Sequence, residues 1–173
     1  RDSHRPRQIF KHVLGTSTDQ DQLIFEEKNE TFTCGIGITS DEKYFIIGTS
    51  DHITTEEYFF PVNSKEIKPT LFQKRKKDVR YSIDSWQGYF YVHTNEGARD
   101  YKVLRCKTNQ IDKLEVFIPA KKETVIGGFE FLDDYILRSE KFDAIPKIFV
   151  RNIKTNKEEE IKISDEPIGC LLY

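Results

Sequence analysis

Residues 40–47, with the sequence SDEKYFII, place a polar turn directly before an apolar run that opens on Tyr44. The same event recurs at Tyr89 and Tyr135, at spacings of 45 and 46 residues. Aromatic and β-branched residues that alternate with polar ones around these turns predict short antiparallel strands. A period of about 45 residues with four short strands in each unit is typical of β-propeller blades.

This period divides the chain into repeating units and predicts an all-β fold. We expect an incomplete β-propeller of about three four-stranded antiparallel blades, with partial blades at both ends, in one domain over residues 1–173. The expected whole blades span residues 33–73, 78–119 and 125–163, and the expected partial blades span residues 8–27 and 168–173.

Three whole units are too few to close a propeller ring. A blade is a small sheet that must bury both faces against its neighbours, so the terminal blades would expose apolar faces and unpaired strand edges. The sequence therefore predicts a part of a larger assembly, or self-association through exposed blade faces and strand edges.

The composition excludes several classes of partner. The net charge is −2, so no global field attracts nucleic acid or an anionic membrane. No apolar run approaches the length that crosses a bilayer, and no segment resembles a signal peptide. The basic run at residues 74–77 predicts a solvated loop between blades, with an anion-binding patch as the alternative.

The three cysteines lack the spacing of a zinc site or a redox pair. Cys34 and Cys170 fall at the repeat positions that Val79 and Val125 occupy, which favours small apolar core residues over disulfides. Unpaired thiols are typical of a reducing compartment, so we expect a cytoplasmic location.

No pattern in the sequence assigns a reaction. There is no G-x-S-x-G, no H-E-x-x-H and no phosphate-binding glycine-rich loop. The histidines, at positions 4, 12, 52 and 93, have spacings that suit no metal site. The residues alone therefore predict no catalytic residue, no metal and no cofactor.

Seven short segments, in order along the chain, resemble one known family. Together they are similar to the oligopeptidase B (protease II) group of the prolyl oligopeptidase family of serine peptidases. The segments are RPxxIxxHxLGT at residues 5–16, LIFEEK at 23–28, HTNEGA at 93–98, YKVLR at 101–105, FEFLDDY at 129–135, IPKI at 145–148 and DEP at 165–167.

This resemblance implies a seven-bladed propeller that caps a C-terminal α/β-hydrolase domain. It also implies that the propeller excludes folded proteins and admits short peptides, which the enzyme cleaves after Arg or Lys. The Ser-Asp-His triad of the family lies in the hydrolase domain, so the resemblance carries no catalytic residue over to this chain.

The resemblance further implies that two loops point towards the active-site cavity. Their residues in this chain are Glu26 and Glu27 in one loop and Asn95 and Glu96 in the other. Acidic groups at a cavity would favour basic peptides by charge complementarity.

Two other readings remain open from the sequence. The chain could be a stand-alone scaffold that binds proteins through propeller faces or exposed strand edges. It could instead be a vestigial fragment without activity that folds only by self-association. The absence of repeated Trp-Asp pairs argues against a WD-repeat protein, since Trp86 is the only tryptophan.

Overall fold

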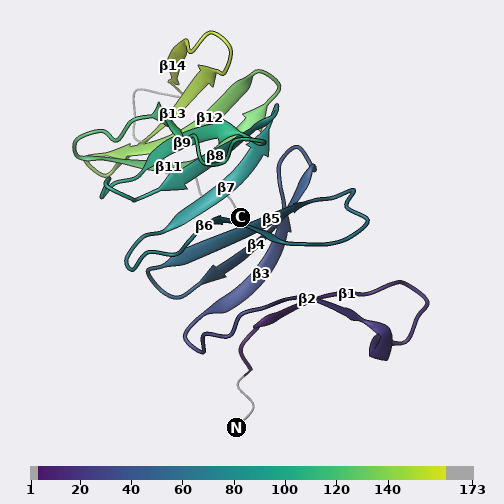
Figure 1. Cartoon of the computed structure of the whole chain (residues 1–173). Coiled ribbons are helices and arrows are strands. Elements are labelled where there is room, and N and C mark those ends of the chain that lie inside the picture. Colours follow the sequence, from purple (N-terminus) through teal and green to yellow (C-terminus); the bar gives the residue numbers. More distant parts are fainter. Residues whose placement is uncertain (1–3, 163–173) are drawn as a thin grey trace.

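A computed structural model describes residues 4–162 of the chain. Those residues form one two-stranded and three four-stranded antiparallel sheets, and the only helical element among them is the three-residue 3-10 turn η1, Thr18–Gln20 (Figure 1). The fold is therefore an all-β, incomplete propeller, as the period predicted.

The strands follow one another along the chain, and each sheet uses consecutive strands. The first, two-stranded sheet contains β1 (Gln8–Lys11) and β2 (Gln22–Glu26). The next sheet contains β3 (Thr33–Ile38), β4 (Tyr44–Ser50), β5 (Thr55–Pro61) and β6 (Thr70–Gln73). The third contains β7 (Tyr81–Trp86), β8 (Tyr89–Thr94), β9 (Lys102–Lys107) and β10 (Glu115–Ile118). The last contains β11 (Thr124–Leu132), β12 (Tyr135–Phe142), β13 (Ile145–Asn152) and β14 (Glu158–Ile161).

Left-handed backbone conformations set the hairpin turns that the sequence pattern revealed. Gln87 and Gly88 both have positive φ, 48° and 82°, and connect β7 to β8 as a two-residue turn. Asp133 adopts φ 46° at the equivalent place before β12, where an aspartate tolerates this conformation. These turns fix the register in which each apolar run meets the preceding strand.

Some strand boundaries differ from the sequence pattern. β7 begins at Tyr81 instead of residue 79, because Asp78 turns with φ 63° and the amide of Val79 donates to the carbonyl of Lys76. β12 and β13 are longer than expected and meet at a two-residue turn formed by Asp143 and Ala144. The strand expected at residues 168–173 lies outside the described residues, as do the DEP segment and Cys170.

The core lies between adjacent sheets, and β8 supplies both of its halves. Phe90 packs towards the preceding sheet, with its ring centroid 4.8 Å from that of Phe59, and Tyr91 packs towards the following sheet, 4.9 Å from Phe131. Both side chains are fully buried. A sheet that is covered on both faces needs consecutive apolar residues rather than strict alternation, which is what β8 shows.

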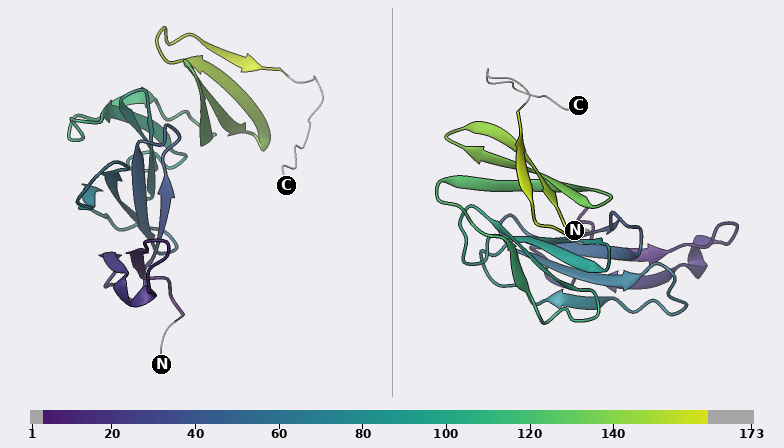
Figure 2. Two further views of the ribbon diagram at one scale, coloured as in Figure 1. Left: turned by 90° about the vertical axis from the view of Figure 1, so that its right-hand side faces the viewer. Right: turned by 90° about the horizontal axis from the view of Figure 1, so that it is seen from above.

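The sheets are not closed into a ring. Figure 2 shows them following one another, with the β1–β2 hairpin beyond one side of the row and the β11–β14 sheet at the other. In the last sheet, Leu132 and Ile145 are exposed apolar residues. Among residues 4–162, no helix is long and apolar enough to cross a membrane.

Candidate functional site

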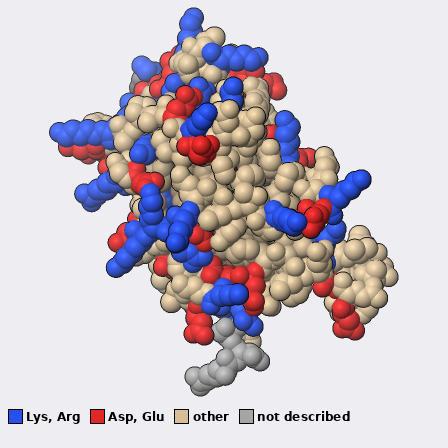
Figure 3. Space-filling view, viewed as in Figure 1, with Lys and Arg blue, Asp and Glu red and all other residues tan. Residues whose placement is uncertain are grey.

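The two loops that the resemblance singled out lie on the same side of their sheets as the basic run. The loop after β2, the loop between β6 and β7, and the loop between β8 and β9 contact one another through side chains. On the face shown in Figure 3, acidic and basic side chains are mixed around an area without charges. Within the three loops the charges are also paired, Arg75 with Glu27 and Lys76 with Glu96, so the site does not present a field of one sign.

Arg75 is the centre of the first part of this network. Its Nη2 donates to Glu27 Oε2 at 2.6 Å and to Glu56 Oε2 at 2.6 Å, and its backbone amide donates to Glu56 Oε1 at 2.8 Å. The guanidinium also lies 4.1 Å from the ring centroid of Phe32. This geometry joins the loop after β2, strand β5 and the β6–β7 loop through one cation.

The ion triad is largely removed from solvent, and this changes its acid–base behaviour. Glu27 and Glu56 are only 5% and 4% exposed. Burial acts to lower the pKa of Arg75, but hydrogen bonds to Glu56 and Glu27 raise it above its ordinary value. Burial acts to raise the pKa of Glu56, but the hydrogen bonds from Arg75 bring it below its ordinary value. Arg75 and Glu56 are therefore both ionised at neutral pH.

Glu26 lies outside this triad. It accepts a hydrogen bond of 2.9 Å from Gln8 Nε2, and Arg7 lies 3.6 Å from its carboxylate. Glu26 thus links the two strands of the first hairpin and stays partly exposed. Of the two adjacent glutamates, Glu27 is buried and Glu26 is partly exposed.

Asn95 and Glu96 have different roles in the second loop. Asn95 Oδ1 accepts from the backbone amide of Arg80 at 2.7 Å, and Asn95 Nδ2 donates to the carbonyl of Asp78 at 3.2 Å, so this side chain fastens one loop to the other. The Glu96 carboxylate pairs with Lys76 Nζ at the surface. Glu96 is therefore the acidic group of this loop, and its partly exposed carboxylate can meet an incoming molecule.

The basic run therefore connects the two predicted loops, because Arg75 reaches Glu27 and Lys76 reaches Glu96. The basic run lies between β6 and β7, so the expected loop between sheets is confirmed. The expectation that its side chains are solvated is wrong for Arg75, which is paired with Glu27 and Glu56. Sequence reasoning missed Glu56, whose only signal was its place in a pair of glutamates directly before three aromatic residues of the strand.

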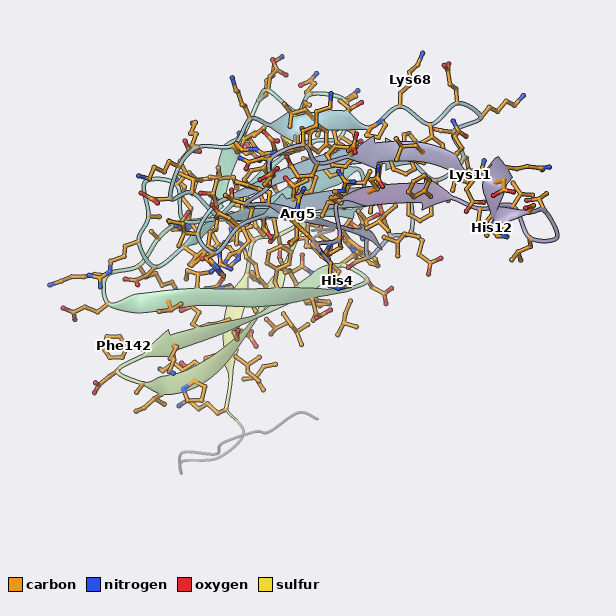
Figure 4. All side chains as sticks on the ribbon, turned by 90° about the horizontal axis from the view of Figure 1, so that it is seen from below. His4, Arg5, Lys11, His12, Lys68 and Phe142 are labelled. Atoms are coloured by element: carbon orange, nitrogen blue, oxygen red, sulfur yellow. The ribbon has the colours of Figure 1, made fainter. Side chains whose placement is uncertain are left out.

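The opposite end of the molecule carries a separate exposed feature. Lys11 and His12 lie at the far end of the β1–β2 hairpin, whereas Arg5 points back towards the sheets (Figure 4). His12 Nδ1 lies 2.6 Å from Asp21 Oδ1 across the hairpin. Beyond it, Leu14 is 93% exposed. This hairpin does not contribute to the loop network.

A cleft of about 320 Å³ opens where the first strands of the three four-stranded sheets come together. β3 contributes Gly37 and Ile38, β7 contributes residues 82–84, and β11 contributes Gly128 and Phe129. Ile46 from β4 and His93 from β8 complete the lining. The cleft is open to solvent and is lined by both apolar and polar groups.

The sequence profile described as "Prolyl oligopeptidase, N-terminal beta-propeller domain" matches residues 1–172. The chain belongs to this family. Protease 2 from Moraxella lacunata is 28% identical over 150 residues, which cover 86% of this chain and 22% of that protein. Dipeptidyl aminopeptidase BI from Pseudoxanthomonas mexicana is 26% identical over 163 residues, which cover 92% of this chain and 22% of that protein.

Solved structures agree with this assignment at the level of the fold. Oligopeptidase B from Trypanosoma brucei, with covalently bound antipain in a closed form, superposes with a TM-score of 0.85 at 20% identity. The superposition covers 95% of this chain and 24% of that one. This prolyl oligopeptidase propeller chain therefore spans about a fifth to a quarter of the length of the relatives it matches.

The described part of this prolyl oligopeptidase propeller offers little chemistry of its own. Residues 4–162 contain no group of three His, Cys, Asp or Glu side chains that could hold a metal ion. Burial raises the pKa of Cys34 and raises that of Cys106 to about 11, so neither thiol is a reactive thiolate at neutral pH.

Proposed function

We propose that this chain is the non-catalytic propeller portion of an oligopeptidase B-like serine peptidase. In this proposal it forms one partial propeller domain over residues 1–173, which gates the access of short peptides to a C-terminal α/β-hydrolase domain. The enzyme would cleave after Arg or Lys. The observation that carries the proposal is the match of the propeller family profile over residues 1–172.

The ion network gives the proposed gate a physical basis. Links between the loops of neighbouring sheets would hold the opening beside those loops narrow. The Glu27–Arg75–Glu56 triad and the Asn95 hydrogen bonds join loops of successive sheets on one side. Breaking these links would widen the opening and admit larger substrates.

Glu96 is the best candidate for a charge that meets the peptide. Its partner Lys76 is 64% exposed in its side chain and is held by this single ion pair, so a basic peptide can displace it at little energetic cost. Glu27 is buried and already neutralised by Arg75, so its contribution to substrate preference would be indirect.

Size-resolved peptidase assays on the intact polypeptide test this proposal. Native mass, determined with an antibody against this chain, should be several times 20.4 kDa. Arg- and Lys-containing peptides of different lengths should then be cleaved with a sharp upper size limit, and Arg75→Gln should relax that limit. A native mass of 20.4 kDa, or equal cleavage of peptides and folded proteins, would overturn it.

The Glu96→Gln variant tests the charge proposal separately. It should weaken kcat/KM for basic peptides and reduce the salt dependence of cleavage, because one attractive charge is lost. Glu115→Gln is a matched control, since Glu115 is also an exposed partner of a cation but lies on β10. Unchanged kinetics in Glu96→Gln would contradict the proposed role.

The open face of the last sheet supports a second proposal, self-association. Leu132, Tyr135 and Ile145 are 59%, 46% and 49% exposed, although each belongs to a strand of this sheet. Leu132 pairs with Tyr135 at one end of β12 and Ile145 pairs with Phe142 at its other end, so exposed apolar side chains at both ends of this strand favour contact with another surface. Sedimentation should show concentration-dependent dimers that Leu132→Glu abolishes, and a monomer at all concentrations would exclude this mode.

We also propose a cytoplasmic location. Cys34 and Cys106 are both buried free thiols, an arrangement that persists most easily in a reducing compartment. Imaging of the tagged protein in its source cells would test this, and a secreted product would overturn it.

A further inference from the structure

The cleft between the first strands has an apolar wall of three isoleucines and one phenylalanine. Ile38, Ile46, Ile83 and Phe129 line it, and they come from four different strands in three sheets. A ligand with a short hydrocarbon body would gain by removing this surface from water. The polar groups of the cleft then decide which head group such a ligand carries.

His93 presents a hydrogen-bond acceptor to the cleft. Its Nε2 lies 2.8 Å from the carbonyl oxygen of Ile126, and a carbonyl can only accept, so Nε2 carries the ring proton. Burial lowers the pKa of His93, which keeps the ring neutral at neutral pH. The other ring nitrogen, Nδ1, is then unprotonated. Stacking of the ring on Tyr101, with centroids 4.5 Å apart, holds it in place.

Asp84 adds a carboxylate to the same cleft. It accepts hydrogen bonds from the backbone amide and hydroxyl of Ser40 at 2.8 and 2.6 Å and from the amide of Ser85 at 2.7 Å. These neutral donors hold the carboxylate in position, and no Lys or Arg among residues 4–162 forms an ion pair with it. Ser82 lies two residues earlier on β7, so its hydroxyl is on the same face.

A second acidic group lies behind the wall of the cleft. Glu57 Oε2 accepts from the backbone amide of the lining residue Ile83 at 2.7 Å. Burial, together with the nearby charge of Asp84, raises the pKa of Glu57 to about 8, so Glu57 is mostly protonated and neutral at pH 7. The negative charge at the cleft therefore comes from Asp84, and within the described part of the chain no cation forms an ion pair with it.

We propose that this cleft binds a primary ammonium group attached to a short aliphatic body. An ammonium has a positive charge and three hydrogen-bond donors. Asp84, the Ser82 hydroxyl and His93 Nδ1 can accept these hydrogen bonds, while the apolar wall of the cleft packs against the hydrocarbon part of the ligand. The identity of the natural ligand rests on the proposed function: a short peptide supplies such a group at its N-terminus or on a lysine side chain.

Titration of the intact protein with n-butylammonium chloride tests the inference. NMR or calorimetry should show saturable binding that perturbs Ile83, Gly128 and His93, and n-butanol, with the same body and no charge, should bind at least tenfold more weakly. Asp84→Asn should weaken butylammonium binding at least tenfold, whereas Glu115→Gln, at a surface pair on β10, should leave it unchanged. Equal binding of butanol and butylammonium would overturn the inference.

A second variant keeps the test valid if Asp84→Asn does not fold. Ser82 is exposed on β7, so Ser82→Lys should fold. The lysine places its own ammonium in the cleft and should therefore abolish butylammonium binding. Retention of full binding in this variant would contradict the site. Two further ligands identify the source of the ammonium group. Tighter binding of Leu-Leu than of acetyl-Leu-Leu would indicate a peptide N-terminus, and binding of acetyl-lysine amide would indicate a lysine side chain.

These outcomes are independent of the proposed gate. If the intact protein has no peptidase activity but binds butylammonium, the proposed function is wrong and the cation site stands. If the peptidase shows the expected size limit but does not bind butylammonium, only the proposed ammonium site is wrong.

Discussion

The carboxylate of Glu57, on β5, accepts a 2.7 Å hydrogen bond from the backbone amide of Ile83, on β7, and so joins two neighbouring sheets through one acidic side chain. Gly48 lies opposite Glu57 in the register of β4 and β5, where a Cβ would come 3.7 Å from Glu57 Oε1. The hydroxyl of Tyr81 also accepts from the amide of Glu57 at 2.8 Å. The free edge of the inner strand β7 is thus covered by side chains of the preceding sheet.

Glu57→Gln should change how stability depends on pH. Burial raises the pKa of Glu57 from 4.5 to about 8, so the folded protein binds more protons than the unfolded chain between these values. The free energy of unfolding contributed by Glu57 is therefore fully present below pH 4.5 and is lost as the pH rises towards 8. The loss should be on the order of 2 to 4 kcal/mol.

Chemical denaturation of both proteins from pH 5 to pH 8 measures this effect. The unmodified protein should lose stability over this window, and Glu57→Gln should lose much less because an amide does not ionise. Glu159→Gln, at an exposed position on the outer strand β14, is the control. Parallel pH profiles for the unmodified protein and Glu57→Gln would show that this carboxyl group is not the source.

Arg75→Met should destabilise the fold by about 3 to 5 kcal/mol, because it leaves Glu27 and Glu56 as buried carboxylates without a cation. Lys68→Met, which removes an exposed surface pair with Glu66, should change stability by less than about 0.5 kcal/mol. Urea denaturation compares the two. Adding Glu56→Gln to Arg75→Met should restore part of the lost stability, because one of the two unpaired carboxylates is removed. A double variant that is less stable than Arg75→Met alone would contradict the ion triad.

Ala144→Gly should stabilise the protein. Ala144 has φ 62° in the two-residue turn between β12 and β13, a left-handed conformation that glycine adopts without a steric penalty. The expected gain is about 1 kcal/mol in the free energy of unfolding. Ala98→Gly, at a buried residue without positive φ, should lower the melting temperature instead. A lower melting temperature for Ala144→Gly would rule out the strained turn.

Gly127→Ala should destabilise β11, because a Cβ at this position would meet the Ser139 side chain and lie 3.1 Å from its carbonyl oxygen. Overpacking of this kind costs about 1 to 3 kcal/mol. Gly128→Ala is a matched control, since a Cβ there would meet nothing within 4 Å. Equal melting temperatures for the two variants would refute the close approach of β11 and β12.

Particular elements show how far sequence reasoning reached. The start of the strand at Tyr89 was predicted, because its turn signal and aromatic run are local properties of the chain, and β8 does begin at Tyr89. β7 began two residues later than expected, because its start depends on the 74–79 loop, which is held by contacts with the next sheet. The predicted site residues Glu27 and Glu96 do come to one side of the molecule, but their cationic partners were not predicted.

By itself, the sequence determined the all-β class, the four-strand unit and the family, since these follow from periodicity, turn residues and ordered motifs that need no knowledge of distant contacts. Only the tertiary structure decided that the partly buried Arg75 pairs with the buried Glu27 and Glu56, and that Ile38, Asp84 and Phe129 line one cleft. The physical reason is that burial and pairing of a charge depend on which sheets pack together, and residues 48 positions apart, such as Glu27 and Arg75, carry no local sign of their contact.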